Sequence, residues 1–451
     1  MTQTAQTRPI FTRQQLIALL LPLVAEQALS VTIGLADTLM VSSVGEAAVS
    51  GVSLVDTFNT LMIQIMSALA TGGAVVTSQY IGHQEPKNAK ATAGQIMLVM
   101  LAFSCTVALV VLFGRHLILR AIFGAIDDDV MAYAETYFLM SALSYPFIGM
   151  YNAGAALFRA QGNSKISMLS SLVMNVLNIG GNAIFIYGCG MAVFGAALAT
   201  LISRIIACTA VLYLLQRPGC MLRVESVQAL RPDRSLIRRI LVIGIPNAIE
   251  NGMFQIGKLA VSSLTSTLGT AAIAANAVAN NTTTLLNIPA NAVGMGALTV
   301  LGQCLGAGDK QQAKRYGGLM MGLAYAGAWA MNLAAFFGGN RFMLQFFNLS
   351  PEATGLALEV MVWFNIISLF IWPSSFTLPN ILRAAGDARY TMVVSIASMW
   401  LFRVALCYLL VGHFGGGLLA IWTGMFVDWA FRSLFFAIRF FSGKWMENSV
   451  I

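Results

Sequence analysis

Twelve long apolar segments make up most of this sequence and leave few folds open to it. A helix needs about 20 mostly apolar residues to cross the hydrocarbon core of a bilayer. Charged residues are 10% of the chain, against about 25% in soluble proteins, so polar side chains cannot cover a water-soluble globule. The segments cover 14–42, 46–80, 93–113, 131–158, 165–188, 192–215, 239–267, 270–305, 316–338, 355–382, 390–411 and 415–438.

These segments are predicted to be helices, because every backbone polar group in lipid must be paired internally. The ten-residue alternating strands typical of membrane barrels are absent from the sequence. The first apolar run is too long for a signal peptide and shows no small-residue cleavage site, so we expect it to be retained. The sequence therefore predicts an all-α integral membrane protein with twelve transmembrane helices.

The chain repeats itself at a constant offset of 224 residues. Because six helices are an even number, both copies enter the membrane from the same side, as in parallel-repeat transporters. We predict two pseudo-symmetric six-helix lobes, 1–215 and 239–451, joined by a polar cytoplasmic linker at 216–238, with a central cleft that rocking of the lobes exposes alternately. Matched pairs include Pro22/Pro246, Glu26/Glu250, Gly72/Gly296, Gln79/Gln303, Gly82/Gly306, Arg159/Arg383 and Gly162/Gly386.

Basic residues predict the orientation, because cytoplasmic connections carry an excess of Lys and Arg. Counted over alternate connections, twenty basic residues fall on one side, Arg159, Arg383 and Arg432 among them. We therefore expect both termini to be cytoplasmic and the membrane to be a bacterial inner membrane. The net charge of +8 then reflects topology rather than a nucleic-acid partner. The opposite side of the membrane has only three basic residues, Arg115, Arg120 and Arg341. The remaining three, Arg204, Lys258 and Arg403, lie within the apolar segments.

Several function classes lack support in the sequence. The six cysteines are scattered without a CxxC pair and the three histidines lie far apart, so neither a disulfide framework nor a metal site is predicted. No P-loop or Gly-rich phosphate motif is present, and energy must come from an ion gradient. No nucleophile and base lie together within the segments, so we expect no enzyme activity and no cofactor.

Acidic residues inside segments are the first candidates for function, since a charge at the centre of a transmembrane helix costs at least about 2.5–3.5 kcal/mol. Asp37 lies deep in an apolar stretch and is predicted to be functional. Two interpretations of Glu26 and its repeat partner Glu250 stay open. Each is either a functional carboxylate or a structural group that hydrogen-bonds to backbone groups left without a helical partner by Pro22 and Pro246.

Amide side chains give a second candidate set. Asn175, Asn178 and Asn182 share one helical face at i, i+3 and i+7. Their oxygens would coordinate Na⁺ or bond a protonated Asp37 carboxyl, and the open alternative is ordinary hydrogen bonding between helices. The repeat equivalents Met399, Phe402 and Leu406 are apolar, so a coupling site is expected in the first lobe. The cation-coupling candidates are Asp37, Asn178, Asn182 and Glu26.

The second half has its own polar positions. Lys258 is the only lysine within a segment, and several asparagines occur along segment 270–305. The candidates for lining the substrate cleft are Glu250, Lys258, Asn276 and Asn280.

The chain resembles the multidrug and toxic compound extrusion (MATE) family over nearly its whole length. The resemblance rests on the duplicated twelve-segment plan and on short stretches. These are Gly34-Leu35-Ala36-Asp37-Thr38, Phe158-Arg159-Ala160-Gln161-Gly162-Asn163 with its copy Leu382-Arg383-Ala384-Ala385-Gly386-Asp387, Asn175-Val176-Leu177-Asn178-Ile179 and Gly195-Ala196-Ala197-Leu198-Ala199.

This resemblance implies a secondary antiporter that exports cationic amphipathic compounds in exchange for H⁺ or Na⁺. It assigns coupling to Asp37, with Asn178 and Asn182 as polar partners. Members of the NorM type also place second-lobe carboxylates where this sequence has Phe254 and Trp372, which favours first-lobe coupling here. We expect a monomer.

The alternative is a flippase or exporter for a polar lipid or lipid-linked glycan. Such a protein would line its cleft with several basic residues, and the sequence offers only Arg204, Lys258 and Arg403 within segments.

Overall fold

The computed structural model describes residues 9–124, 127–224, 231–345, 347, 349–447 and 450–451, and only the backbone at 32–39, 41–42, 46 and 343. Within this part of the chain the regular structure is entirely helical. The N-terminal half contains α1 (Arg13–Ser42), α2 (Glu46–Gly82), α3 (Pro86–Phe123), α4 (Asp128–Ala160), α5 (Ser164–Asn182), η1 (Ala183–Gly188) and α6 (Ala192–Gln216).

The C-terminal half has more, shorter helices. They are α7 (Arg234–Ser266), α8 (Thr270–Leu286), α9 (Ile288–Gly306), α10 (Lys310–Ala334), η3 (Ala335–Gly339), α11 (Asn340–Leu344), α12 (Pro351–Phe376), α13 (Leu378–Ala384), α14 (Ala388–Ser398), η4 (Met399–Ala405), α15 (Leu406–Gly412), α16 (Leu418–Phe441) and η5 (Lys444–Glu447).

Helices cover all twelve predicted spans, with differences at breaks and ends. Span 270–305 is divided between α8 and α9, and span 355–382 between α12 and α13. Pro289 and Pro379 lie in the first turns of α9 and α13, where a missing N–H costs nothing but prevents the preceding helix from continuing. Helix α7 starts at Arg234 and so takes up the end of the predicted linker, 216–238.

Ten helical segments of the described chain are long and apolar enough to cross a membrane. Their outward surface is apolar as well: Phe113, Phe337 and Phe441 are 88%, 81% and 77% exposed. Exposed apolar surface on this scale is expected of a protein that has lipid as its solvent. The chain is a multi-pass integral membrane protein.

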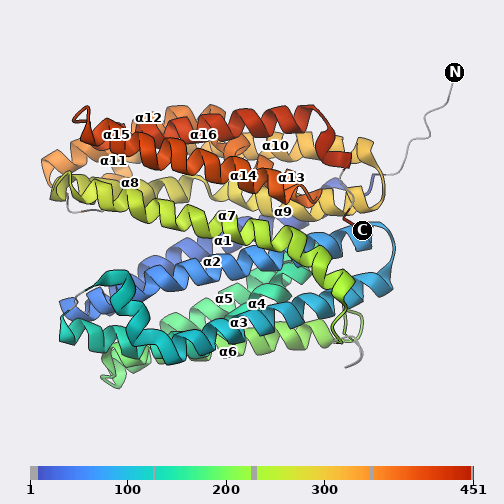
Figure 1. The fold of residues 1–451 in the computed structure, drawn as a ribbon, viewed down its shortest axis with the longest axis horizontal. Coiled ribbons are helices and arrows are strands. Elements are labelled where there is room, and N and C mark those ends of the chain that lie inside the picture. The colour runs from blue at the N-terminus through green and yellow to red at the C-terminus, as the bar shows by residue number, and fades with distance from the viewer. Residues whose placement is uncertain (1–8, 125–126, 225–230, 346, 348, 448–449) are drawn as a thin grey trace.

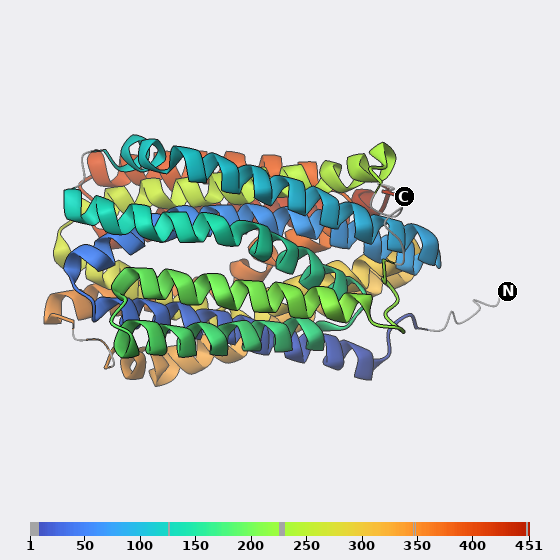
Figure 2. The same cartoon turned by 90° about the horizontal axis from the view of Figure 1, so that it is seen from below.

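The helices form two lobes that run side by side along the molecule. Figure 1 shows α1–α6 in the lower half and the helices from α7 onward in the upper half. Figure 2, turned by 90°, shows the start of α1 and the C-terminus at the same end of the long axis. We call this end, with the connections 83–85, 161–163 and 307–309, the terminal end.

The first helix of each lobe begins in the core of the other lobe. Leu16 and Leu19 of α1 belong to the apolar core formed mainly by C-lobe residues. Ile240 and Ile243 of α7 belong to the core formed mainly by N-lobe residues. These pairs are equivalent at the 224-residue offset, so the crossover follows the pseudo-symmetry and fixes the lobes to each other near the terminal end.

Candidate functional site

Two glutamines join the lobes through hydrogen bonds that the repeat relates. Gln79 of α2 donates to the Ala384 carbonyl at 2.8 Å, and Gln303 of α9 donates to the Ala160 carbonyl at 2.8 Å. Ala160 and Ala384 end α4 and α13, and carbonyls at a helix C-terminus have no partner within their helix. Each glutamine therefore satisfies an orphan carbonyl of the other lobe.

Glycines let the same helices approach at backbone distance. A Cβ on Gly82 would lie 2.0 Å from the Gln303 carbonyl oxygen, and a Cβ on Gly306 would lie 2.0 Å from that of Gln79. His83 Nδ1 also lies 3.0 Å from the Gly306 carbonyl oxygen. The glutamines and glycines that matched across the repeat are thus a closed, symmetric contact between the lobes at the terminal end.

The amide face predicted on span 165–188 is buried in the N-lobe. Asn178 Nδ2 donates to Thr200 of α6 at 3.0 Å, and Asn182 Nδ2 lies 3.5 Å from Asn178 Oδ1. Asn175 Nδ2 donates to Ser171 at 3.2 Å. Asn178 and Asn182 therefore come together, and Thr200 joins them. The side chain of Asp37, the predicted coupling residue, lies outside the described residues.

Glu26 is buried in an ion pair. Its carboxylate lies 3.3 Å from Arg159 Nη1 and accepts hydrogen bonds from Ser167 at 2.9 and 3.0 Å. These contacts tie α1 to the end of α4 and to α5. The side-chain partners of Glu26 are therefore Arg159 and Ser167, and whether its carboxylate is functional or structural stays a prediction.

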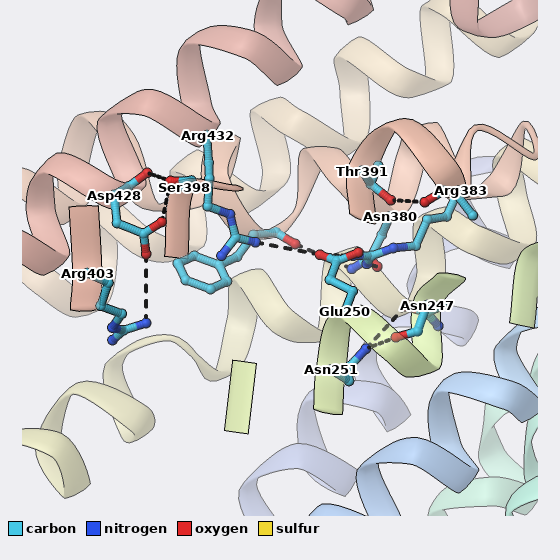
Figure 3. Close-up of polar contacts among 12 residues, drawn as sticks. Asn247, Glu250, Asn251, Asn380, Arg383, Thr391, Ser398, Arg403, Asp428 and Arg432 are labelled. Atoms are coloured by element: carbon cyan, nitrogen blue, oxygen red, sulfur yellow. Dashed lines mark hydrogen bonds and ion pairs between the residues drawn. The ribbon is translucent and has the colours of Figure 1, made fainter. Parts of the chain in front are cut away.

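The C-lobe has a larger buried ionic cluster, drawn in Figure 3. Glu250 Oε1 lies 2.6 Å from Arg383 Nη2 and 3.9 Å from Arg432 Nη2. Asp428 Oδ2 lies 3.9 Å from Arg403 Nη1. Three basic side chains thus share two carboxylates, and Asp428 and Glu250 are 0% and 5% exposed.

Aromatic rings and a serine complete this C-lobe cluster. Ser398 donates to the Asp428 carboxylate. The Arg432 guanidinium carbon lies 4.7 Å from the Phe376 ring centroid, and that of Arg403 lies 5.0 Å from the Phe254 centroid. Cation–π contacts of this length stabilise a desolvated guanidinium. Phe254, where the resemblance implies a carboxylate, therefore faces arginines.

Two arginines of the C-lobe cluster correct the charge count made from the sequence. Arg383 and Arg432 were assigned to the basic connections, but they lie within α13 and α16 and are 8% and 3% exposed. Arg159 is likewise within α4. The interior therefore has more basic residues than Arg204, Lys258 and Arg403. One sequence signal for these buried pairs was available: Glu26/Glu250 and Arg159/Arg383 recur at the same 224-residue offset.

The remaining cleft candidates of the C-lobe lie on α7 and α8. Asn276 Oδ1 accepts a hydrogen bond from Trp422 Nε1 at 3.0 Å. Asn280 Nδ2 donates to the Asn276 carbonyl at 2.8 Å and to its side chain at 3.1 Å. Lys258 is exposed on α7. Asn276 and Asn280 are thus adjacent, whereas Glu250 is enclosed in the ionic cluster.

A polar cluster in the N-lobe was not predicted from the sequence. Asn59 donates to Asp56 at 3.3 Å and to Ser141 at 3.1 Å, and accepts from Tyr145 at 2.7 Å. Arg204 Nη1 donates to Ser144 at 2.6 Å. Only the tertiary fold brings these residues of α2, α4 and α6 together. Among the described residues, no three His, Cys, Asp or Glu side chains gather as metal ligands.

The sequence of this chain is similar to the sequences of known transporters. A model of the MatE family matches residues 22–184 and 246–409. The Uncharacterized transporter YisQ of Bacillus subtilis is 26% identical, covering 99% of this chain and 98% of its own length. The Probable multidrug resistance protein NorM of Thermotoga maritima is 26% identical, covering 97% and 94%.

Solved structures share the fold. One, described as the outward-facing conformation of a multidrug resistance MATE family transporter, has a TM-score of 0.86 at 19% identity and covers 95% of this chain and 94% of its own. Another, a MOP superfamily transporter from Pyrococcus furiosus, has a TM-score of 0.86 at 20% identity and covers 96% and 95%. It is described as having a binding pocket of reverse polarity that suggests a different function.

Proposed function

The chain belongs to the MATE family of membrane transporters, and on that premise we propose that it is a secondary antiporter that exports cationic amphipathic compounds in exchange for H⁺ or Na⁺. The relative from Thermotoga maritima is named a probable multidrug resistance protein, which supports drugs and toxic compounds as cargo. The protein acts as a monomer in a bacterial inner membrane, since both repeats needed for alternating access are in one chain.

The symmetric contact of Gln79 and Gln303 at the terminal end carries this proposal. Both glutamines are buried and bond across the lobes, so the lobes are closed against each other at one end of the molecule. With the terminal end in the cytoplasm, this is the state in which a cleft between the lobes opens outward. Rocking of the lobes to open the cleft inward requires that these two hydrogen bonds break.

The coupling ion exchanges in the N-lobe. Asn178, Asn182 and Thr200 offer amide and hydroxyl oxygens in a buried site beside α1, and hard oxygen ligands suit Na⁺ as well as a protonated carboxyl. Asp37 of α1 supplies the negative charge for which the ion and a cationic cargo compete. Glu26, held by Arg159 and Ser167, anchors α1 against α4 and α5 while the ion exchanges at Asp37.

The experiment is efflux of a fluorescent cation from proteoliposomes, with a pH gradient and a Na⁺ gradient imposed separately. Asn178→Ala is compared with Phe402→Ala, its equivalent at the 224-residue offset, at equal protein incorporation. We expect Asn178→Ala to weaken ion dependence by about 1–3 kcal/mol, the cost of a buried bond left unmade, and Phe402→Ala to preserve it. Loss of ion dependence in Phe402→Ala alone would contradict first-lobe coupling.

One observation favours a second candidate, export of a polar lipid or another anionic cargo. The C-lobe cluster has three arginines for two carboxylates, with Arg403 and Arg432 5% and 3% exposed. Excess positive charge suits an anionic group better than a cation. The description of reverse pocket polarity in the Pyrococcus furiosus relative supports it. Efflux of paired cationic and anionic dyes separates the candidates, because only the cargo's charge differs.

A further inference from the structure

A long groove lies between the lobes at the terminal end, and its lining contains no residue of the C-lobe ionic cluster and none of Asn178, Asn182 and Thr200. Helix α1 and α10 form its walls, and the chain from Pro9 to Thr12 closes one end. Its volume is about 1820 Å³, well above the roughly 300–1,000 Å³ of pockets for drug-sized ligands. The apolar walls include Ile17, Leu21, Leu319 and Leu323, which are 58%, 67%, 43% and 39% exposed.

Hydrogen bonds fix the closed end of the groove. Gln312 Oε1 accepts from the Ile10 backbone N–H at 2.9 Å, and Tyr316 Oη donates to the Phe11 carbonyl at 2.7 Å. The residues before α1 are thereby attached to α10 of the other lobe. The groove therefore depends on how the two lobes are placed relative to each other.

The length of the groove matches the depth of one membrane leaflet. Its lining on α1 runs from Arg13 to Val24, and the eleven helical steps between these residues, at about 1.5 Å each, span about 16 Å. Half of a hydrocarbon core about 30 Å thick is about 15 Å. A groove of this length that begins at the level of the lipid head groups ends near the bilayer centre.

Basic side chains gather at the head-group end of the groove. Arg13, Lys310 and Arg315 line it there and are exposed. The one acidic residue of the lining, Asp309, directs both carboxylate oxygens to Gln312 as the cap of α10, at 2.9 Å each. The charge that the groove offers to a ligand is therefore positive at the head-group level, with apolar walls below it.

From this arrangement we propose that the groove binds an anionic phospholipid, with its phosphate at Arg13, Lys310 and Arg315 and its acyl chains along α1 and α10. The lipid bridges the two lobes, so it stabilises the conformation in which the terminal end is closed. Binding of this kind is separate from cargo transport, and it makes the conformational equilibrium depend on the anionic lipid content of the leaflet.

The test is native mass spectrometry of the purified full-length protein with equimolar phosphatidylglycerol and phosphatidylcholine of identical acyl chains. The groove variant combines Arg13→Gln, Lys310→Gln and Arg315→Gln. Its control combines Lys87→Gln, Arg234→Gln and Arg238→Gln, exposed basic residues outside the groove lining. Each basic residue is worth roughly fivefold in binding at an anionic surface, so we expect roughly 100-fold weaker phosphatidylglycerol binding in the groove variant and little change in the control.

A second variant, Leu21→Trp, keeps all three charges and narrows the apolar part of the groove. We expect it to reduce retention of phosphatidylglycerol, and it decides the matter if the groove variant does not fold. The proposal is overturned if phosphatidylcholine binds as tightly as phosphatidylglycerol, if the control variant loses as much binding as the groove variant, or if Leu21→Trp binds as the unmodified protein does. Displacement of phosphatidylglycerol by a transported cation would make the groove a cargo site and would also overturn it.

Discussion

At the scale of single residues, the interior of each lobe has a carboxylate and an arginine at positions that the repeat relates. Glu26 pairs with Arg159 and Glu250 with Arg383. The sequence showed that both positions recur, but not that they touch, because 133 residues separate them in each copy. Burial of Arg432 beside Glu250 was not predictable, since its position near the end of a span is typical of a cytoplasmic arginine.

Removal of the Glu250 carboxylate tests the C-lobe cluster. Glu250→Ala leaves Arg383 and Arg432 buried without their acid, and breaking a buried pair in this way costs about 3–5 kcal/mol. Glu26→Ala is the matched variant: it frees one arginine, whose side chain is 16% exposed, and we expect a smaller loss. Thermal unfolding in detergent measures both. Equal melting temperatures would contradict a tightly coupled C-lobe cluster.

A double variant separates charge burial from packing. In Glu250→Leu with Arg383→Leu, apolar side chains replace both ions, and such replacements are often neutral for stability. We expect the double variant to melt above Glu250→Ala. If it melts below, Arg383 contributes more through its other contacts, such as its 2.7 Å hydrogen bond to Asn380, than its burial without the acid costs.

At the scale of helices, apolar length predicted the twelve spans, but local chemistry decided where they break. Spans 46–80 and 131–158 are continuous, whereas their repeat equivalents are interrupted at Asn287 and Thr377. The repeat positions of Pro289 and Pro379 are Ile65 and Ala155 in the N-lobe, which leave the backbone N–H in place.

The crossing of α2 and α7 depends on glycine. A Cβ on Gly72 would lie 2.6 Å from the Gly244 backbone nitrogen, which cannot move as a side chain can. Gly72→Val is expected to push the helices apart and cost about 1–3 kcal/mol through overpacking. The control Gly322→Val places the same side chain on α10, where a Cβ meets nothing within 4 Å. Unfolding temperatures of both variants give the comparison, and equal values would argue against a close crossing.

At the scale of the molecule, the orientation in the membrane remains a prediction from charge. We expect Gly219 in the linker to be cytoplasmic and Asp128 at the start of α4 to be external. The test labels Gly219→Cys and Asp128→Cys in intact cells with an impermeant thiol reagent, in a protein whose six native cysteines are replaced. Reaction at residue 219 and not at 128 would invert the topology, although the two-lobe fold would stand.

The closed terminal end predicts how the lobes respond when their symmetric hydrogen bonds are removed. Gln79→Ala with Gln303→Ala deletes both bonds to the Ala384 and Ala160 carbonyls. Each bond contributes about 1 kcal/mol net, so together they shift the equilibrium between conformations by roughly 30-fold toward the state open at the terminal end, about 1.4 kcal/mol being a tenfold change.

Spin labels at Lys87 and Lys314, exposed residues on the two lobes at this end and outside the groove lining, measure that shift as a longer distance population. Gln95→Ala is the control, because Gln95 bonds the Arg231 carbonyl beside the start of α7 and not the α2–α9 contact. If the lobes rock in a single equilibrium, the double variant must also reduce the population in which the cleft opens outward, and by the same factor. Opening of the terminal end with no change at the opposite end would mean that the two gates move independently, and alternating access would then need a second moving element.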